Sequence, residues 1–114
     1  MLKREVQRIL VEAALRAWEG YLDTWIEKYG QQGLDLLVEE DRDAIEHLQR
    51  TRPDLMAWIP RVKRIVSGRD WDVDSFTERL CEYLRRKGLR VTTKHEKWIR
   101  REMERVKQFL TEGD

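Results

Sequence analysis

The chain has 114 residues, of which 40% are hydrophobic and 39% charged, with a net charge of +1 at neutral pH. This length and the five Trp residues predict one folded domain over residues 1–114 and argue against a disordered chain. The single cysteine excludes an intramolecular disulfide and a cysteine-based metal site, and no long apolar run marks a membrane span, so a cytoplasmic protein with no membrane partner is expected.

Residues 2–29 are predicted to form one long helix. Apolar residues recur every three or four positions along it, which is the spacing of a helix with a wide apolar face. Gly20 lies inside this segment and predicts a bend or a close helix crossing. We expect a second, charged stripe of the helix to face solvent; its members are Glu5, Arg8, Glu12, Arg16, Glu19, Asp23 and Glu27.

Two helices are predicted in the middle of the chain. Residues 30–33 have a glycine at each end and predict a turn, after which a second helix over about 34–49 carries a dense acidic outer side. A third helix over about 53–67 is expected to begin at Pro53, because proline suits the first turn of a helix. Pro60 removes a backbone hydrogen bond inside this segment, so we expect the helix to split or kink there.

The last two helices are predicted to pack as an antiparallel pair. Ser75–Glu78 and Thr93–Glu96 both have capping-box spacing and predict the starts of a fourth and a fifth helix, the fifth ending near residue 111. Gly88 predicts a left-handed stop of the fourth helix, and the short connection favours antiparallel neighbours. Because nothing alternates with a period of two, the sequence predicts an all-α fold, a single compact bundle of about five helices.

Charge is distributed unevenly along the chain. Residues 1–50 carry seven Lys and Arg against eleven Asp and Glu, a balance of −4, whereas residues 51–114 carry sixteen against eleven, a balance of +5. Cations are expected to gather on the last two helices, at Arg86, Arg90, Lys94, Lys97, Arg101 and Arg105. The last four recur at helical spacing and share one face. Such a face would bind the phosphates of DNA or RNA without reading sequence, with an affinity that falls with salt.

Enzymatic signals are weaker than the charge pattern. Arg42 and His47 have a spacing that resembles the Arg-x4-His motif of the HEPN ribonucleases, and the resemblance implies an RNA-cleaving pair in which Arg42 stabilises phosphate charge and His47 exchanges a proton. Arg90 and His95 have the same spacing. Asp43 and His47 lie one turn apart, but an acidic solvated helix face accounts for them. No metal, no cofactor and no catalytic residue is therefore predicted.

A protein partner is the main alternative to nucleic acid. The first helix is wide enough to bury part of its face on a partner, and the opposed charges of the two halves favour self-association. Trp71 lies between two acids in a loop, where it is predicted as an interface anchor if exposed, or docks on its own bundle. Cys81 is expected to pack as a small hydrophobe.

These observations lead to a ranked prediction of function. First comes a non-catalytic helical protein that contacts nucleic-acid phosphates through its basic C-terminal helices, as a small subunit of a nucleoprotein assembly. The alternative is a protein-interaction module or homo-oligomeric adaptor that binds no nucleic acid. A HEPN-like ribonuclease is the remote alternative.

Overall fold

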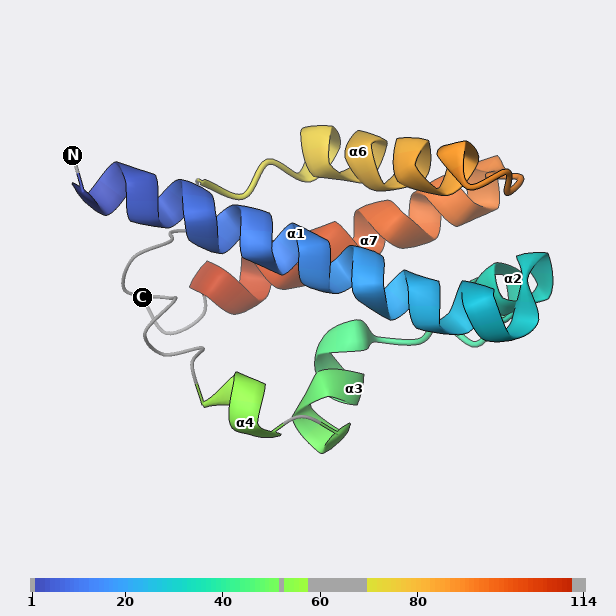
Figure 1. The fold of residues 1–114 in the computed structure, drawn as a ribbon, viewed down its shortest axis with the longest axis horizontal. Coiled ribbons are helices and arrows are strands. Elements are labelled where there is room, and N and C mark those ends of the chain that lie inside the picture. Colours follow the sequence, from blue (N-terminus) through green and yellow to red (C-terminus); the bar gives the residue numbers. More distant parts are fainter. Residues whose placement is uncertain (1, 52, 58–69, 112–114) are drawn as a thin grey trace.

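The computed structural model describes residues 2–51, 53–57 and 70–111 (Figure 1). Their helices are α1 (Leu2–Tyr29), α2 (Gln31–Glu39), α3 (Ala44–Thr51), α4 (Pro53–Met56), α6 (Val73–Arg86) and α7 (Thr93–Thr111). These segments contain no strand, so the predicted all-α bundle is confirmed. The expected kink at Pro60 lies outside the described residues.

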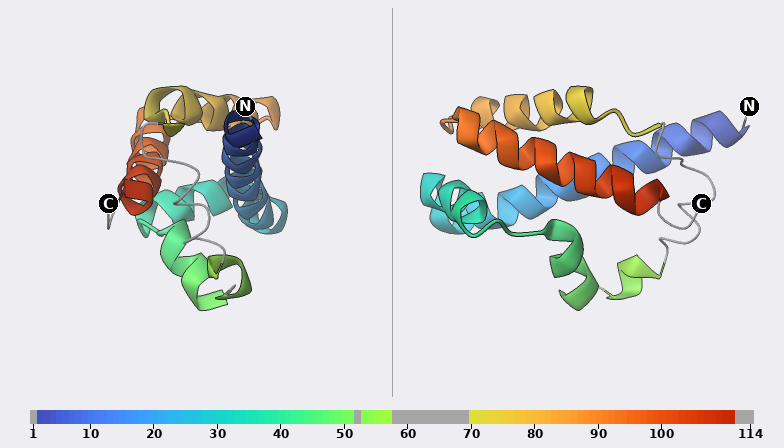
Figure 2. Two further views of the ribbon diagram at one scale, coloured as in Figure 1. Left: turned by 90° about the vertical axis from the view of Figure 1, so that its left-hand side faces the viewer. Right: turned by 180° about the vertical axis from the view of Figure 1, so that it is seen from behind.

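The long helix α1 runs the length of the molecule; α2 and α6 pack on it, and α7 packs on α6 and α2. In Figure 1, α6 runs in the same direction as α1, and α7 returns antiparallel to α6. The end-on view in Figure 2 shows α6 between α1 and α7, with α2, α3 and α4 on the opposite side. The predicted C-terminal antiparallel pair is therefore confirmed. Among the described segments, none of the helices combines the length and apolar character that a membrane crossing requires.

The core lies between α1, α2, α6 and α7. Leu15 and Leu22 of α1 and Trp98 and Met103 of α7 are almost fully buried, as their helical spacing predicts. Cys81 of α6 packs among them, and burial raises the pKa of its thiol to about 11. Because Cys81 is 3% exposed, the prediction that it packs as a small hydrophobe is confirmed. A thiol that stays protonated at neutral pH is also a poor nucleophile.

Acids on one side of α1 bind α6, so the prediction that the charged stripe faces solvent along its whole length is wrong. The Arg79 guanidinium donates two hydrogen bonds to Glu12, of 2.6 and 2.7 Å, and reaches Glu19 at 3.2 Å. Asp23 accepts the Tyr83 hydroxyl at 2.7 Å. The hydrogen bonds from Arg79 outweigh desolvation and hold the pKa of Glu12 at about 2, so its carboxylate stays charged well into acid.

Small and apolar residues occupy the side of α1 that faces away from the core. Val6, Ile9, Ala13, Ala17 and Gly20 follow one another at spacings of three or four residues, and all five are exposed. Ile9 is the most exposed large apolar residue among the described ones, at 66%. These five residues define the outer face of α1, and charged side chains border it: Glu5, Arg8, Glu12 and Arg16 line one hollow with Ile9 and Ala13.

The second helix ends earlier than predicted, and the last part of the predicted segment belongs to a separate helix, α3. The carbonyl of Leu37 accepts the Arg42 N–H at 3.1 Å, and that of Val38 accepts the Asp41 N–H at 3.2 Å, the pattern of a Schellman stop. Asp41 occupies its left-handed position, with φ of +47°. The carboxylate of Asp43 then accepts the Ile45 N–H at 2.9 Å and caps α3. The single helix over 34–49 is therefore a wrong prediction.

The predicted turn over residues 30–33 is also wrong beyond Gly30. Gly30 has a φ of +62° and ends α1, but α2 begins at the next residue and includes Gly33. A Cβ atom at Gly33 would lie 2.5 Å from the carbonyl oxygen of Trp25, so this glycine permits a close approach of α1 and α2. Gly33 is thus a packing residue within a helix.

The two C-terminal helices begin at caps other than those predicted. Asp72, in place of Ser75, caps α6 by accepting the Ser75 N–H at 3.2 Å. The Thr92 hydroxyl, in place of Thr93, accepts the His95 N–H at 3.5 Å at the start of α7. Gly88 follows α6 with φ of +86°, which confirms the predicted left-handed stop.

Candidate nucleic-acid interface

Four of the six predicted phosphate-binding cations gather around the connection between α6 and α7. Arg86 ends α6, Arg90 lies in the connection, and Lys94 and Lys97 lie in the first turns of α7. All four side chains are exposed, and none forms an ion pair with another described residue. We call these four residues the turn cations. They lie at the end of the molecule opposite the N-terminus of α1 (Figure 1).

The other two predicted cations are bound to an acid of the preceding connection. Arg101 Nη1 lies 3.0 Å from Asp41 Oδ2, and Arg105 Nη2 lies 3.2 Å from the same oxygen. Arg105 also binds Glu102, whose exposure is 0%. The basic stripe of α7 is therefore open to solvent at Lys94 and Lys97 and matched by acid in its second half, which corrects the expectation of four free cations on one face.

Buried Glu102 explains why Arg105 is held more firmly than Arg101. The Arg105 side chain is 28% exposed, against 52% for Arg101. Burial alone would lower the pKa of Arg105, but the charges of Glu102 and Asp41 raise it. A carboxylate without solvent needs such a partner, so Arg105 has a structural role that the sequence pattern did not indicate.

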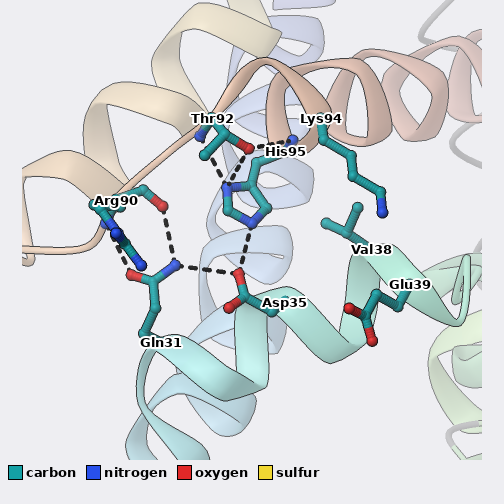
Figure 3. A pocket seen from close by; sticks show the side chains of 8 residues that line it. All are labelled: Gln31, Asp35, Val38, Glu39, Arg90, Thr92, Lys94 and His95. Carbon is teal, nitrogen blue, oxygen red and sulfur yellow. Dashed lines mark hydrogen bonds and ion pairs between the residues drawn. The ribbon is translucent and has the colours of Figure 1, made fainter.

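A pocket of about 310 Å³ opens beside the turn cations, between α2 and the start of α7 (Figure 3). Inside it, His95 Nδ1 accepts the Thr92 N–H at 2.9 Å, so the proton is on Nε2, which donates to Asp35 at 2.7 Å. The Gln31 side chain accepts the Arg90 N–H at 2.8 Å and donates to the Arg90 carbonyl at 3.1 Å. These bonds fasten the α6–α7 connection to α2 and position the turn cations.

Asp35, His95 and Thr92 form a chain of adjacent carboxylate, imidazole and hydroxyl groups. They do not, however, form a nucleophilic triad. His95 Nδ1 already accepts a backbone N–H, so it is not free to take the proton of the Thr92 hydroxyl. That hydroxyl also caps α7. Burial alone would raise the pKa of Asp35, yet hydrogen bonds from His95 and Gln31 lower it, so a carboxylate remains to anchor the imidazole.

Trp71 is buried in its own bundle, so its prediction as an exposed interface anchor is wrong. Its side chain is 1% exposed and packs edge-to-face on Phe76, with ring centroids 4.8 Å apart. Asp70 and Asp72 on either side remain exposed. The loop thus buries the large apolar ring and leaves its flanking carboxylates in water, as the docking alternative predicts.

The Arg42 and His47 side chains are engaged in packing against α1. The Arg42 guanidinium lies over the Trp25 ring, 5.2 Å from its centroid, and binds Glu40. The His47 ring packs on Tyr21, with centroids 5.3 Å apart. These contacts give no support to a HEPN-like catalytic pair. In the part of the chain that the structure describes, no group of three or more His, Cys, Asp or Glu could hold a metal ion.

Asp41, Glu102 and the Asp35–His95 pair are the important residues that sequence reasoning missed. The spacing of Asp43 and Glu46 is a capping signal that could have divided the second helix and drawn attention to Asp41. Glu102 lies four residues after Trp98 and four before Val106, so the apolar spacing of α7 could have marked it as buried. Together, the fold and these contacts define an all-α bundle with a cationic surface at one end. No protein-family model, curated protein or solved structure matches this chain.

Proposed function

We propose that this is a non-catalytic binding protein that holds the phosphate backbone of DNA or RNA on the turn cations. One observation supports this most: four exposed cations without ion-pair partners among the described residues gather at one end of the bundle. α7 begins among them, and the positive end of its dipole adds to their potential. Phosphate contacts of this kind carry no sequence information, so the proposed binding is non-specific.

Nearby acids set an upper limit on the affinity. Asp35 and Glu39 of α2 line the same pocket as Lys94, and their charges reduce the local potential. We therefore expect a Kd in the non-specific range, about 10⁻⁴ to 10⁻⁶ M at physiological salt. Such an affinity suits a small subunit that adds phosphate contacts within a larger nucleoprotein assembly. A cytoplasmic location is part of the proposal, since the free thiol of Cys81 suits a reducing compartment.

Replacing Lys94 and Lys97 with alanine should weaken this binding and make it less sensitive to salt. Four phosphate contacts predict a slope of about −3 in log K against log salt, and removing two of them should halve it. Fluorescence anisotropy of labelled DNA and RNA oligonucleotides, titrated between about 50 and 200 mM salt, measures both quantities. Both side chains are exposed, so the fold should not change.

The matched control is the Arg4→Ala, Arg8→Ala double variant. It removes the same charge from exposed positions at the opposite end of the molecule (Figure 1). The proposal requires this variant to keep the wild-type salt slope. Equal losses in the two double variants would mean that net charge alone attracts the oligonucleotide, and absence of wild-type binding at low salt would refute the proposal.

Self-association through the outer face of α1 is the second candidate function, favoured by the exposure of Val6 and Ile9. Antiparallel packing of two copies around Ala13 would set Ile9 of one copy opposite Ala17 of the other, and Val6 opposite Gly20. Large residues would thus meet small ones across a two-fold axis. The five residues themselves are uncharged, but Arg8 and Arg16 line the same hollow as Ile9 and Ala13 and would lie at the edge of such a contact.

Ile9→Glu should abolish any dimer that forms through this face, because it buries a charge in the contact. Sedimentation velocity over a wide range of protein concentration measures the effect. Gln32→Glu places the same charge at an exposed position on α2 and serves as the control. A wild-type protein that sediments as a monomer at every concentration would exclude this second candidate.

A further inference from the structure

We infer that Arg101 and Arg105 form a second phosphate site, which the carboxylate of Asp41 occupies in the free protein. This inference rests on the proposed function, because it extends the surface of the turn cations. Arg101 Nη1 and Arg105 Nη2 lie 3.0 and 3.2 Å from the same oxygen, Asp41 Oδ2. Two arginines converging on a single anionic oxygen is an arrangement that also suits a phosphate oxygen.

Asp41 is accessible to a competing anion. Its side chain is exposed, and it belongs to the short connection between α2 and α3, outside both helices. Its left-handed backbone is fixed by the Schellman hydrogen bonds of residues 37–42, which do not involve its carboxylate. A phosphate could therefore displace the carboxylate from the arginines without unwinding α2.

Glu102 would keep Arg105 in place after Asp41 leaves. Arg105 Nη1 binds Glu102, whereas a different nitrogen, Nη2, binds Asp41. The guanidinium is thus held from its buried side and offers its other edge to solvent. A phosphate arriving there would meet an arginine that is already oriented, which lowers the conformational cost of binding.

The second site lies on the same face of α7 as the exposed residues Lys94 and Lys97. Lys94, Lys97, Arg101 and Arg105 recur along one face of α7, and eleven residues of helix span about 16 Å. A single phosphate cannot bridge that distance, whereas a polynucleotide strand can. The ligand class we infer is therefore a strand of several nucleotides that passes from the turn cations to Arg101 and Arg105.

Asp41→Asn tests the inference, because asparagine keeps the size of the side chain and tolerates a left-handed backbone. We expect this variant to bind a labelled oligonucleotide about tenfold more tightly at low salt, with a salt slope steeper by about one to two. Glu40→Gln is the matched control: it removes the same charge one residue away, where the carboxylate binds Arg42. Adding Arg101→Ala to Asp41→Asn should remove most of the gain.

The possible outcomes separate the inference from the function on which it rests. If the wild type binds and Asp41→Asn binds with the same affinity and slope, the second site is wrong and the turn cations alone hold the strand. If Glu40→Gln gains as much as Asp41→Asn, the gain reflects net charge, and the second site is equally wrong. If neither the wild type nor Asp41→Asn binds at low salt, the proposed function fails and the second site with it.

Discussion

Arg105→Ala is expected to lower the free energy of unfolding by about 3 kcal/mol, the largest effect of any substitution considered for this chain. Arg105 binds Glu102, which is fully buried, and also Asp41. Removing the guanidinium takes away a cation bound to a carboxylate that is shielded from water, and such a loss costs more than the loss of a surface ion pair. Urea unfolding followed by circular dichroism measures the change.

Arg101→Ala is the control for this prediction. Arg101 binds the same oxygen of Asp41, but its side chain is half exposed, so its loss should cost less than about 1 kcal/mol. Glu102→Gln combined with Arg105→Ala should recover part of the lost stability, because the amide needs no cation. Equal costs for Arg105→Ala and Arg101→Ala would show that Glu102 does not depend on Arg105.

Because Arg105 stabilises the fold through Glu102 and Asp41, an Arg105 variant is a poor probe of phosphate binding. An alanine at Arg105 would weaken binding through partial unfolding as well as through a lost phosphate contact. Lys94 and Lys97 carry no such structural role, since both are exposed and lack ion-pair partners among the described residues. Variants of these two lysines therefore report on phosphate contacts alone.

Gly33→Ala should destabilise the protein by about 2 kcal/mol, the second-largest effect that we expect. The added methyl group would lie 2.5 Å from the Trp25 carbonyl oxygen and 3.2 Å from the Tyr29 Cβ. Because the obstacle is backbone, α1 and α2 would have to move apart, and Leu34 and Leu37 next to the site would lose packing. Thermal unfolding measures the change.

Gly20→Ala gives the opposite expectation and provides the control. Nothing lies within 4 Å of a Cβ atom at Gly20, which is an exposed position inside α1. Alanine there should stabilise the helix by about 1 kcal/mol. The comparison belongs at low protein concentration, since Gly20 lies on the outer face of α1. A destabilisation of similar size at both glycines would contradict the distinction between them.

Local rules accounted for most of the fold. Apolar spacing identified α1 and α7, and Gly88 marked the end of α6, because these features depend on neighbours within one or two turns. The division of α2 from α3 also has a local cause in Asp43. In contrast, the contact of Glu12 with Arg79 joins residues 67 positions apart, which no helical pattern encodes.

The candidate site was only half predictable for the same reason. Sequence spacing placed the cations of α7 on one face, and it also puts Glu96 and Arg100 one helical turn apart. In the structure Glu96 accepts from Arg85 at 2.5 Å, and Arg100 binds Asp74, because α6 and α7 lie side by side. Asp41 reaches Arg105 across 64 positions of sequence. Which cations remain free is thus decided by tertiary packing.

The most direct test of the central claim is a titration of isotope-labelled protein with a short single-stranded oligonucleotide, followed by ¹H–¹⁵N NMR at low salt. We expect the largest shifts at the amides of Arg86, Arg90, Lys94 and Lys97, and we expect added salt to reverse them. Shifts that gather on α1 instead, or a spectrum that the oligonucleotide leaves unchanged, would refute phosphate binding by the turn cations.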